Sequence, residues 1–240
     1  MTAMNENGIL TAVLLPGLDG TGLLLSDFAK LLESHFSVKV VRYPTHQPFD
    51  YDDLMGLVRT QLPTGDYIVI GESFSGPLAL RLAQEEPAGL KGVVLGASFA
   101  RLDLPAKPVL SYLANLISPR LVPTSMLTHF LLGRSATPEL RKHLKQALAI
   151  VDPLVLSIRA RAALKVDYLD SPQTVLQPVL YLRANADRLV PKAAAQHLSK
   201  IVPDLRIHDI AAPHFLFQVA PYECAAAINY FRQQISTSIA

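Results

Sequence analysis

Ser73 lies in a sequence context that suits a serine nucleophile. The segment Gly-Glu-Ser-Phe-Ser-Gly at 71–76 follows the apolar, β-rich run at 67–70 and precedes a helical pattern at 76–86. A strand that turns sharply into a helix through small residues presents a serine at its apex with an exposed hydroxyl. Gly71 and Ser75 are small enough for such a turn. The segment predicts an activated serine, although Gly-x-Ser-x-Ser is a weaker signal than Gly-x-Ser-x-Gly and also fits an ordinary turn.

A nucleophilic serine needs a base, and the base needs an acidic partner that fixes its tautomer. Asp187 follows the buried-strand pattern at 178–183, and His214 follows the strand pattern at 205–210. The carboxyl ends of parallel strands meet at one edge of a sheet, so we expect both side chains near Ser73. The chain order Ser, Asp, His is the order expected on such a sheet.

Other histidines and aspartates compete for these two roles. The competing histidines lie in helical patterns, in a loop before the serine or within a strand: His35, His46, His129, His143, His197 and His208. His214 alone combines the right chain order with the right loop. Asp209 lies within a strand and Asp204 at the start of one, so Asp187 is the preferred acid and both others stay open as alternatives.

An acyl-transfer site also needs hydrogen-bond donors for the oxyanion. One is expected to be the backbone N–H of Phe74, the residue after the serine, and the other an N–H from an early strand-to-helix loop. The loop at 16–22, Pro-Gly-Leu-Asp-Gly-Thr-Gly, follows a strand pattern at 9–15 and offers the N–H of Leu18. A phosphate-binding loop is less favoured, because the loop has neither the Lys-Ser/Thr pair of a P-loop nor a full dinucleotide fingerprint.

Together these motifs resemble the α/β-hydrolase superfamily, especially its small capped carboxylesterases and thioesterases, among them pimeloyl-carrier-protein methyl ester esterases. The resemblance rests on the loop at 14–22, the turn at 71–76, Asp187 after a late strand and His214 in Pro-His-Phe. Two departures stand out, since Pro-Gly replaces the more usual His-Gly before the oxyanion residue and Ser75 replaces the second glycine of the turn.

This resemblance implies a role for each of the five residues. Ser73 would be the nucleophile, His214 the base and Asp187 the acid, while the amides of Leu18 and Phe74 would form the oxyanion hole. It covers almost the whole chain. No cofactor is expected, and no metal site either, because no cluster of Cys and His residues has metal-site spacing.

The remaining sequence alternates strand and helix patterns, which predicts a mostly parallel six-stranded α/β sheet with helices on both faces. Strands are expected near 9–15, 38–43, 67–71, 92–97, 178–184 and 205–210. Helices are expected near 23–35, 51–62, 76–86, 192–201 and 216–234. Residues 1–97 and 171–240 would form one α/β-hydrolase core.

The alternation fails over 98–170, where helical patterns follow one another at 108–117, 125–132, 138–151 and 153–166. We expect a helical cap inserted in the core, which would wall the pocket with Leu, Met and Phe side chains. This segment has ten basic and five acidic residues, against a net charge of +2 for the whole chain. The excess is typical of a solvated helix surface, and it also fits an acidic carrier protein or coenzyme A at the pocket mouth.

Three classes of function stay open: a serine hydrolase of esters or thioesters with an apolar acyl group, an acyltransferase with the same residues, and a non-enzymatic binding module. A small-molecule substrate is expected, whereas nucleic acid is not, because the basic residues lack aromatic neighbours. Residues 1–8 lack the pattern of a signal peptide, and no apolar run is long enough to span a bilayer, so a cytoplasmic location is expected. The single Cys224 excludes an intrachain disulfide.

Overall fold

The computed structural model of the chain describes residues 9–103, 123–169 and 173–237. Within these ranges six strands form one sheet in the order β2-β1-β3-β4-β5-β6, and every pairing is parallel. The strands are β1 (Thr11–Leu15), β2 (Ser37–Val40), β3 (Tyr67–Glu72), β4 (Leu90–Gly96), β5 (Val179–Ala184) and β6 (Leu205–Ile210). The predicted α/β fold with a six-stranded parallel sheet is confirmed.

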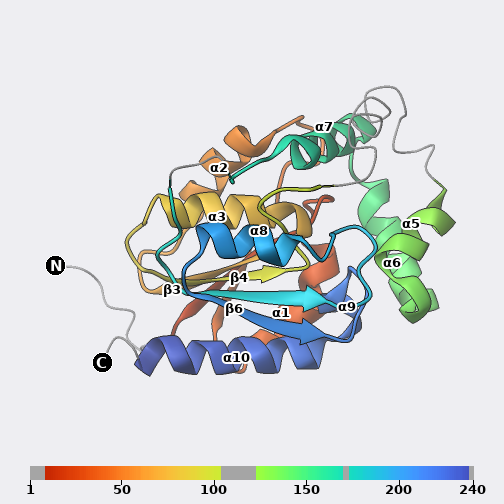
Figure 1. The fold of residues 1–240 in the computed structure, drawn as a ribbon. Helices are drawn as coiled ribbons and strands as arrows, with labels where there is room; N and C mark the ends of the chain where they lie inside the picture. The colour runs from red at the N-terminus through yellow and green to blue at the C-terminus, as the bar shows by residue number, and fades with distance from the viewer. Residues whose placement is uncertain (1–8, 104–122, 170–172, 238–240) are drawn as a thin grey trace.

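Helices cover both faces of the sheet (Figure 1). Alternation along β1 sends Val13 and Leu15 into one apolar layer and Ala12 and Leu14 into the other. The first layer is completed by α2 (Tyr51–Thr60), α3 (Gly76–Gln84) and α8 (Ala194–Ile201). The second is completed by α1 (Ser26–Leu32), α9 (Leu216–Val219) and α10 (Pro221–Thr237), with Cys224 buried in it as a free thiol. Two apolar layers therefore hold the sheet rigid beneath its carboxyl edge.

The two edge strands are less buried than the four central ones. Residues of β2 alternate between exposed and half-buried, and β6 exposes Ile207, His208 and Asp209. The structure ends β2 at Val40, earlier than the predicted boundary at residue 43. The N–H of Val41 still donates to the carbonyl of Leu14 in β1 at 2.9 Å, but the N–H of Tyr43 donates to the carbonyl of Gly20 in the loop at 16–22 at 2.8 Å.

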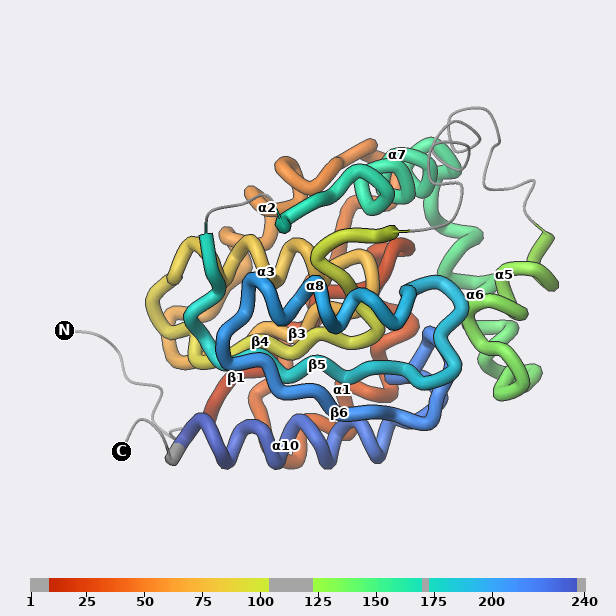
Figure 2. Tube along the Cα trace, viewed as in Figure 1, coloured from red at the N-terminus to blue at the C-terminus, as the bar shows by residue number. Residues whose placement is uncertain are grey.

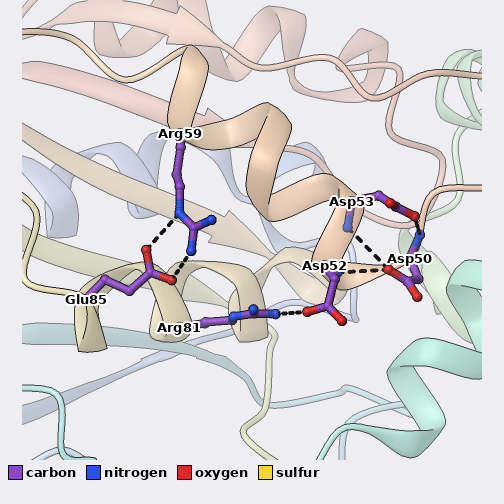
Figure 3. A network of polar contacts seen from close by, with 6 residues as sticks. All are labelled: Asp50, Asp52, Asp53, Arg59, Arg81 and Glu85. Carbon is purple, nitrogen blue, oxygen red and sulfur yellow. Dashed lines mark hydrogen bonds and ion pairs between the residues drawn. The ribbon is translucent and has the colours of Figure 1, made fainter.

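A polar network on the surface joins α2 to α3, the helix that follows Ser73 (Figure 3). The carboxylate of Asp50 caps α2 by accepting from two amides of its first turn. Arg81 of α3 pairs with Asp52, and Nε of Arg59 donates to Glu85 at 2.9 Å. Such exposed pairs contribute about 0–1 kcal/mol each. These pairs connect α2 to α3 at the surface but add little to the stability of the core.

A helical insertion separates β4 from β5 and lies at the carboxyl edge of the sheet (Figures 1 and 2). Its described helices are α5 (Thr124–Leu131), α6 (Pro138–Ala149) and α7 (Pro153–Lys165). The predicted helix at 108–117 lies outside the described residues. Arg101 and Asp167 form an antiparallel bridge where the chain leaves and rejoins the sheet unit. No helix in the described ranges is both long and apolar enough to cross a membrane.

Candidate active site

Ser73 lies at a strained turn between β3 and α3. The short 3-10 turn η2 (Ser73–Ser75) follows β3 directly, and Ser73 has a left-handed φ of 47°. A non-glycine residue rarely adopts this conformation, which persists where the surroundings fix it. A Cβ at Gly71 would lie 2.7 Å from the carbonyl oxygen of Ser75, so only glycine fits at position 71.

Three side chains that are far apart in the sequence form one hydrogen-bonded chain. Ser73 Oγ lies 2.7 Å from His214 Nε2, and His214 Nδ1 lies 2.8 Å from Asp187 Oδ2. The other carboxylate oxygen of Asp187 accepts from the backbone N–H groups of Leu189 at 2.8 Å and Val190 at 3.0 Å. The loops after β5 and β6 thus present an oriented imidazole to Ser73.

The competing residues are engaged elsewhere. Asp209 pairs with Arg183 on the neighbouring strand at 2.6 Å, and Asp204 bonds to Arg206 at 3.1 Å. Of the other histidines, His129 lies 2.7 Å from a nitrogen of Arg188, and His197 lies 3.2 Å from Asp103. His129 is exposed, and so are His35, His46, His143 and His208.

Ser75, the residue that stands where the related turn has glycine, joins the Ser73 turn to the loop at 16–22. Its buried hydroxyl donates to the carbonyl oxygen of Pro16 and lies 2.7 Å from the hydroxyl of Tyr43. Burial raises the pKa of Tyr43 far above its usual value, so the phenol stays protonated and donates to Ser75. The turn that carries Phe74 and the loop that carries Leu18 are therefore fixed to each other.

Glu72 is a buried carboxyl beside the site. One of its oxygens accepts from Gln218 Nε2 at 2.8 Å, and the N–H of Gly17 also donates to it. Burial, with a smaller contribution from Asp19, raises its pKa to about 7, against the lowering effects of these two hydrogen bonds and of His214. Glu72 therefore changes its charge close to neutral pH.

An apolar cavity of about 330 Å³ opens onto Ser73 and His214 and includes Leu18 and Phe74 in its wall. The insertion contributes mainly leucine and alanine side chains: Leu127, Leu131, Leu144, Leu148, Ala160, Ala163 and Leu164. Phe99, near the start of the segment 98–170, and Phe215, which follows His214, also line the cavity. Contrary to the expected methionine lining, Met126 is exposed, because it lies beside the α5 face that carries Leu127 and Leu131. The cavity suits an apolar group and offers few polar contacts.

A second, basic cavity of about 650 Å³ lies on the insertion, between α5 and α6. Its charged and polar lining includes Thr128, His129, Arg141, Lys142 and Lys145. The three cations are exposed on α6. This part of the predicted positive charge is thus gathered at one place on the surface, apart from the apolar cavity.

Comparison with known proteins agrees with this fold, which is that of an α/β hydrolase. The family described as serine aminopeptidase, S33, matches residues 47–214, and the chain belongs to this family. A 2-(acetamidomethylene)succinate hydrolase from Mesorhizobium japonicum is 26% identical over 194 residues, which are 76% of this chain and 69% of the relative. The biotin biosynthesis bifunctional protein BioHC from Cellvibrio japonicus is 28% identical over 209 residues, which are 82% of this chain but only 41% of that protein.

Solved structures also share the fold. MenH from S. aureus superposes with a TM-score of 0.81, covering 97% of this chain and 96% of its own, at 14% identity. At that identity the likeness establishes the fold alone. The suspected relation to α/β hydrolases of the esterase type is thus supported, and the chain is a hydrolase of this superfamily.

Two polar residues beside the site were not expected from the sequence. Arg159 lies on α7 in the apolar stripe Val155, Arg159, Ala163, and its side chain is fully buried. A cation at a core position of a helix is the signal that would have found it. Glu72 carries no such signal, because its neighbours Gln218 and Gly17 come from distant parts of the chain.

Proposed function

We propose that the protein is a serine hydrolase that cleaves a carboxylic ester or thioester of an apolar acyl group through an acyl-enzyme. The observation that carries this proposal is the contact of Ser73 with His214, and of His214 with Asp187, at the wall of an apolar cavity. A serine, an imidazole and a carboxylate in this order are the parts that nucleophilic acyl transfer requires.

In the first half of the reaction Ser73 Oγ attacks the acyl carbon while His214 Nε2 takes the hydroxyl proton. The carbonyl oxygen becomes an oxyanion, which accepts hydrogen bonds from the N–H groups of Leu18 and Phe74. The intermediate then expels the alcohol or thiol, which receives the proton from His214. Asp187 holds the imidazole in the tautomer that accepts at Nε2 and stabilises its protonated form.

In the second half a water molecule attacks the acyl-enzyme, and His214 takes one of its protons. The tetrahedral intermediate collapses, the carboxylic acid leaves, and the proton returns to Ser73 Oγ. The strained φ of Ser73 supports this use, since such strain is common at sites where the chain must expose a nucleophile.

The proposal is tested with a panel of esters and acyl thioesters of increasing chain length, with parent and Ser73→Ala proteins. We expect kcat to fall by several orders of magnitude and labelling by a fluorophosphonate to disappear in the variant, while the fold is kept. Ser199→Ala is the matched control, because its exposed hydroxyl bonds only within α8, to Gln196. Near-parental turnover by Ser73→Ala would contradict the assignment, and product analysis with added alcohol separates hydrolysis from acyl transfer.

We further propose that residues 98–170 act as a cap that closes the acyl pocket. The leucines of α5, α6 and α7 in the cavity wall support this role, because without the insertion that wall would be open to water. A cavity of about 330 Å³ is near the lower end of the range for small-molecule sites and favours a short or medium acyl chain.

The basic cavity between α5 and α6 is proposed to bind an anionic portion of the substrate, as offered by an acidic carrier protein or coenzyme A. Its cations Arg141, Lys142 and Lys145 and its hydroxyl groups support an anion partner. The resemblance to carrier-protein ester esterases favours the same partner. A cytoplasmic location, where such carriers occur, stays a prediction.

Charge reversal at Arg141 and Lys145 tests this partner. We expect it to raise KM for an acyl-coenzyme A but not for a small neutral ester, and added salt to have the same selective effect. Lys200→Glu on α8 is the control, because it likewise reverses a positive charge, but on another part of the exposed surface. An equal response of both substrates would indicate that the basic cavity is only a solvated surface and does not bind an anionic portion of the substrate.

A further inference from the structure

Arg159 is a buried cation that links the insertion to the loop carrying Leu18. Its side chain is fully buried, and its Nη1 donates to the carbonyl oxygens of Leu18 at 3.1 Å and Asp19 at 3.0 Å. Its Nη2 donates to the carbonyl of Pro44 at 2.7 Å, and its guanidinium lies 5.4 Å from the centre of the Tyr43 ring. These partners are backbone carbonyls and an aromatic face.

Burying a guanidinium without a bonded carboxylate is costly. Burial lowers the pKa of Arg159, while Tyr43 and the carboxylate of Asp19 raise it. That carboxylate is itself bonded to the N–H of Thr21 at 2.9 Å. An apolar residue would fill the same stripe of α7 without this cost. We therefore look to the contacts between Arg159 and the loop at 16–22 for the benefit that offsets it.

The carbonyl groups of residues 16–20 in that loop are all engaged. Pro16 accepts from Ser75, Gly17 from the N–H of Gly20 at 3.0 Å, and Gly20 from the N–H of Tyr43 at 2.8 Å. The carbonyls of Leu18 and Asp19 are the two that Arg159 binds. Every peptide unit from Pro16 to Gly20 is therefore held by a donor.

Two of these peptide units decide where the N–H of Leu18 points. The unit before Leu18 is held through the carbonyl of Gly17, and its N–H points the opposite way because the peptide bond is planar and trans. The unit after Leu18 is held only through its carbonyl, and there the donor is Arg159. Without the guanidinium this second unit loses its donor, and the bond from the N–H of Gly20 to the carbonyl of Gly17 alone is left to hold the N–H of Leu18.

Gly20 shows how closely the loop fits around this side chain. A Cβ at Gly20 would lie 2.4 Å from Nη1 of Arg159 and 2.8 Å from Cβ of Tyr43, and its φ of 71° is left-handed. Both the space and the backbone conformation therefore require glycine. The loop folds closely around the guanidinium.

We infer that Arg159 is a positioning residue, which holds the N–H of Leu18 in place for the developing oxyanion. The oxyanion hole is therefore ordered only when α7 packs against the loop at 16–22. This inference rests on the proposed function, because it assigns Leu18 to the oxyanion hole. Loss of one oxyanion donor costs about 10²–10³ in kcat, and a displaced donor is expected to cost about 10–100-fold.

The test compares parent, Arg159→Met, Arg159→Lys and the control Lys165→Met on one ester. Methionine fills the space without a buried charge, but the carbonyls of Leu18, Asp19 and Pro44 lose their donor, so some loss of stability is expected and kcat is measured under conditions where the variant is folded. We expect kcat to fall by about 10–100-fold in Arg159→Met with KM changed by less than about 3-fold. Affinity for a trifluoromethyl ketone, which forms a tetrahedral adduct with Ser73, should fall in parallel with kcat.

The controls separate positioning from a structural role. Lys165→Met removes one positive charge from the exposed end of the same helix and should match the parent. If Arg159→Met does not fold, Arg159→Lys is used for the test, because its ammonium keeps the charge but cannot reach the carbonyls of Leu18, Asp19 and Pro44 together. Parental kcat and parental ketone affinity in a folded Arg159 variant would overturn the inference. An inactive parent, or one that a fluorophosphonate does not label, would instead overturn the proposed function.

Discussion

Replacing Glu72 by glutamine should change how the stability of the protein depends on pH. In the folded protein burial raises the pKa of Glu72 from the ordinary 4.5 to about 7. Below pH 4.5 the carboxyl is neutral in both the folded and the unfolded chain. Between 4.5 and 7 the unfolded chain ionises first, so the free energy of unfolding of the parent falls as the pH rises through this window.

The size of the effect follows from the shift. Each pKa unit corresponds to about 1.36 kcal/mol, so the full loss is about 3 kcal/mol, of which about 2.5 kcal/mol falls between pH 5 and 8.5. A glutamine at position 72 resembles the protonated carboxyl, since it keeps one acceptor oxygen and remains neutral. The groups near Glu72 are Asp19, His214, Gln218 and the buried Cys224, and these remain in both proteins.

The assay is urea unfolding of parent and Glu72→Gln at fixed pH values from 5 to 8.5. We expect the stability of the variant relative to the parent to increase by about 2.5 kcal/mol across this range. Glu33→Gln, which changes an exposed glutamate, should show no such trend. A difference between parent and Glu72→Gln that stays constant with pH would refute the reasoning from burial.

Three further predictions concern single positions. Asp187→Asn should leave the fold intact but lower kcat by about 10⁴, because His214 loses control of its tautomer; steady-state kinetics test this, and a small effect would favour another acid. Gly96→Ala should destabilise by about 1–3 kcal/mol in urea unfolding, because its Cβ would lie 2.5 Å from the buried ring of Phe217. Gly56→Ala should instead stabilise by up to about 1 kcal/mol, because an added Cβ there meets nothing within 4 Å in an exposed part of α2. Equal effects of the two alanines would contradict this account.

The fold was predictable because each strand of the core carries its own local signal. Short apolar runs followed by small residues, as at 67–76, identify both a strand and the turn that ends it. Ser73, Asp187 and His214 could be chosen together because parallel strands bring their carboxyl ends to one edge, and the structure places these three side chains in contact.

The polar shell behind the site could not be predicted in the same way. Arg159 contacts Leu18 across 141 residues, and Glu72 contacts Gln218 across 146. No local pattern encodes such pairs, which depend on how the insertion and α9 pack against the loop at 16–22. The expected methionine in the cavity wall was wrong for a related reason, since neighbouring residues on a helix point in different directions and composition does not reveal which of them faces the pocket.

The hydroxyl of Ser75 also limits how this sequence can change. Glycine is small enough for position 75, yet it would leave two buried groups, the carbonyl of Pro16 and the hydroxyl of Tyr43, without their present partner. An unsatisfied buried polar group costs about 1–3 kcal/mol, so Ser75→Gly alone would weaken the protein. If Tyr43→Phe first removes the hydroxyl of Tyr43, the later Ser75→Gly change leaves only the carbonyl of Pro16 without its partner. Changing this turn to one with glycine is therefore expected to cost less stability when Tyr43→Phe comes first than when Ser75→Gly comes first.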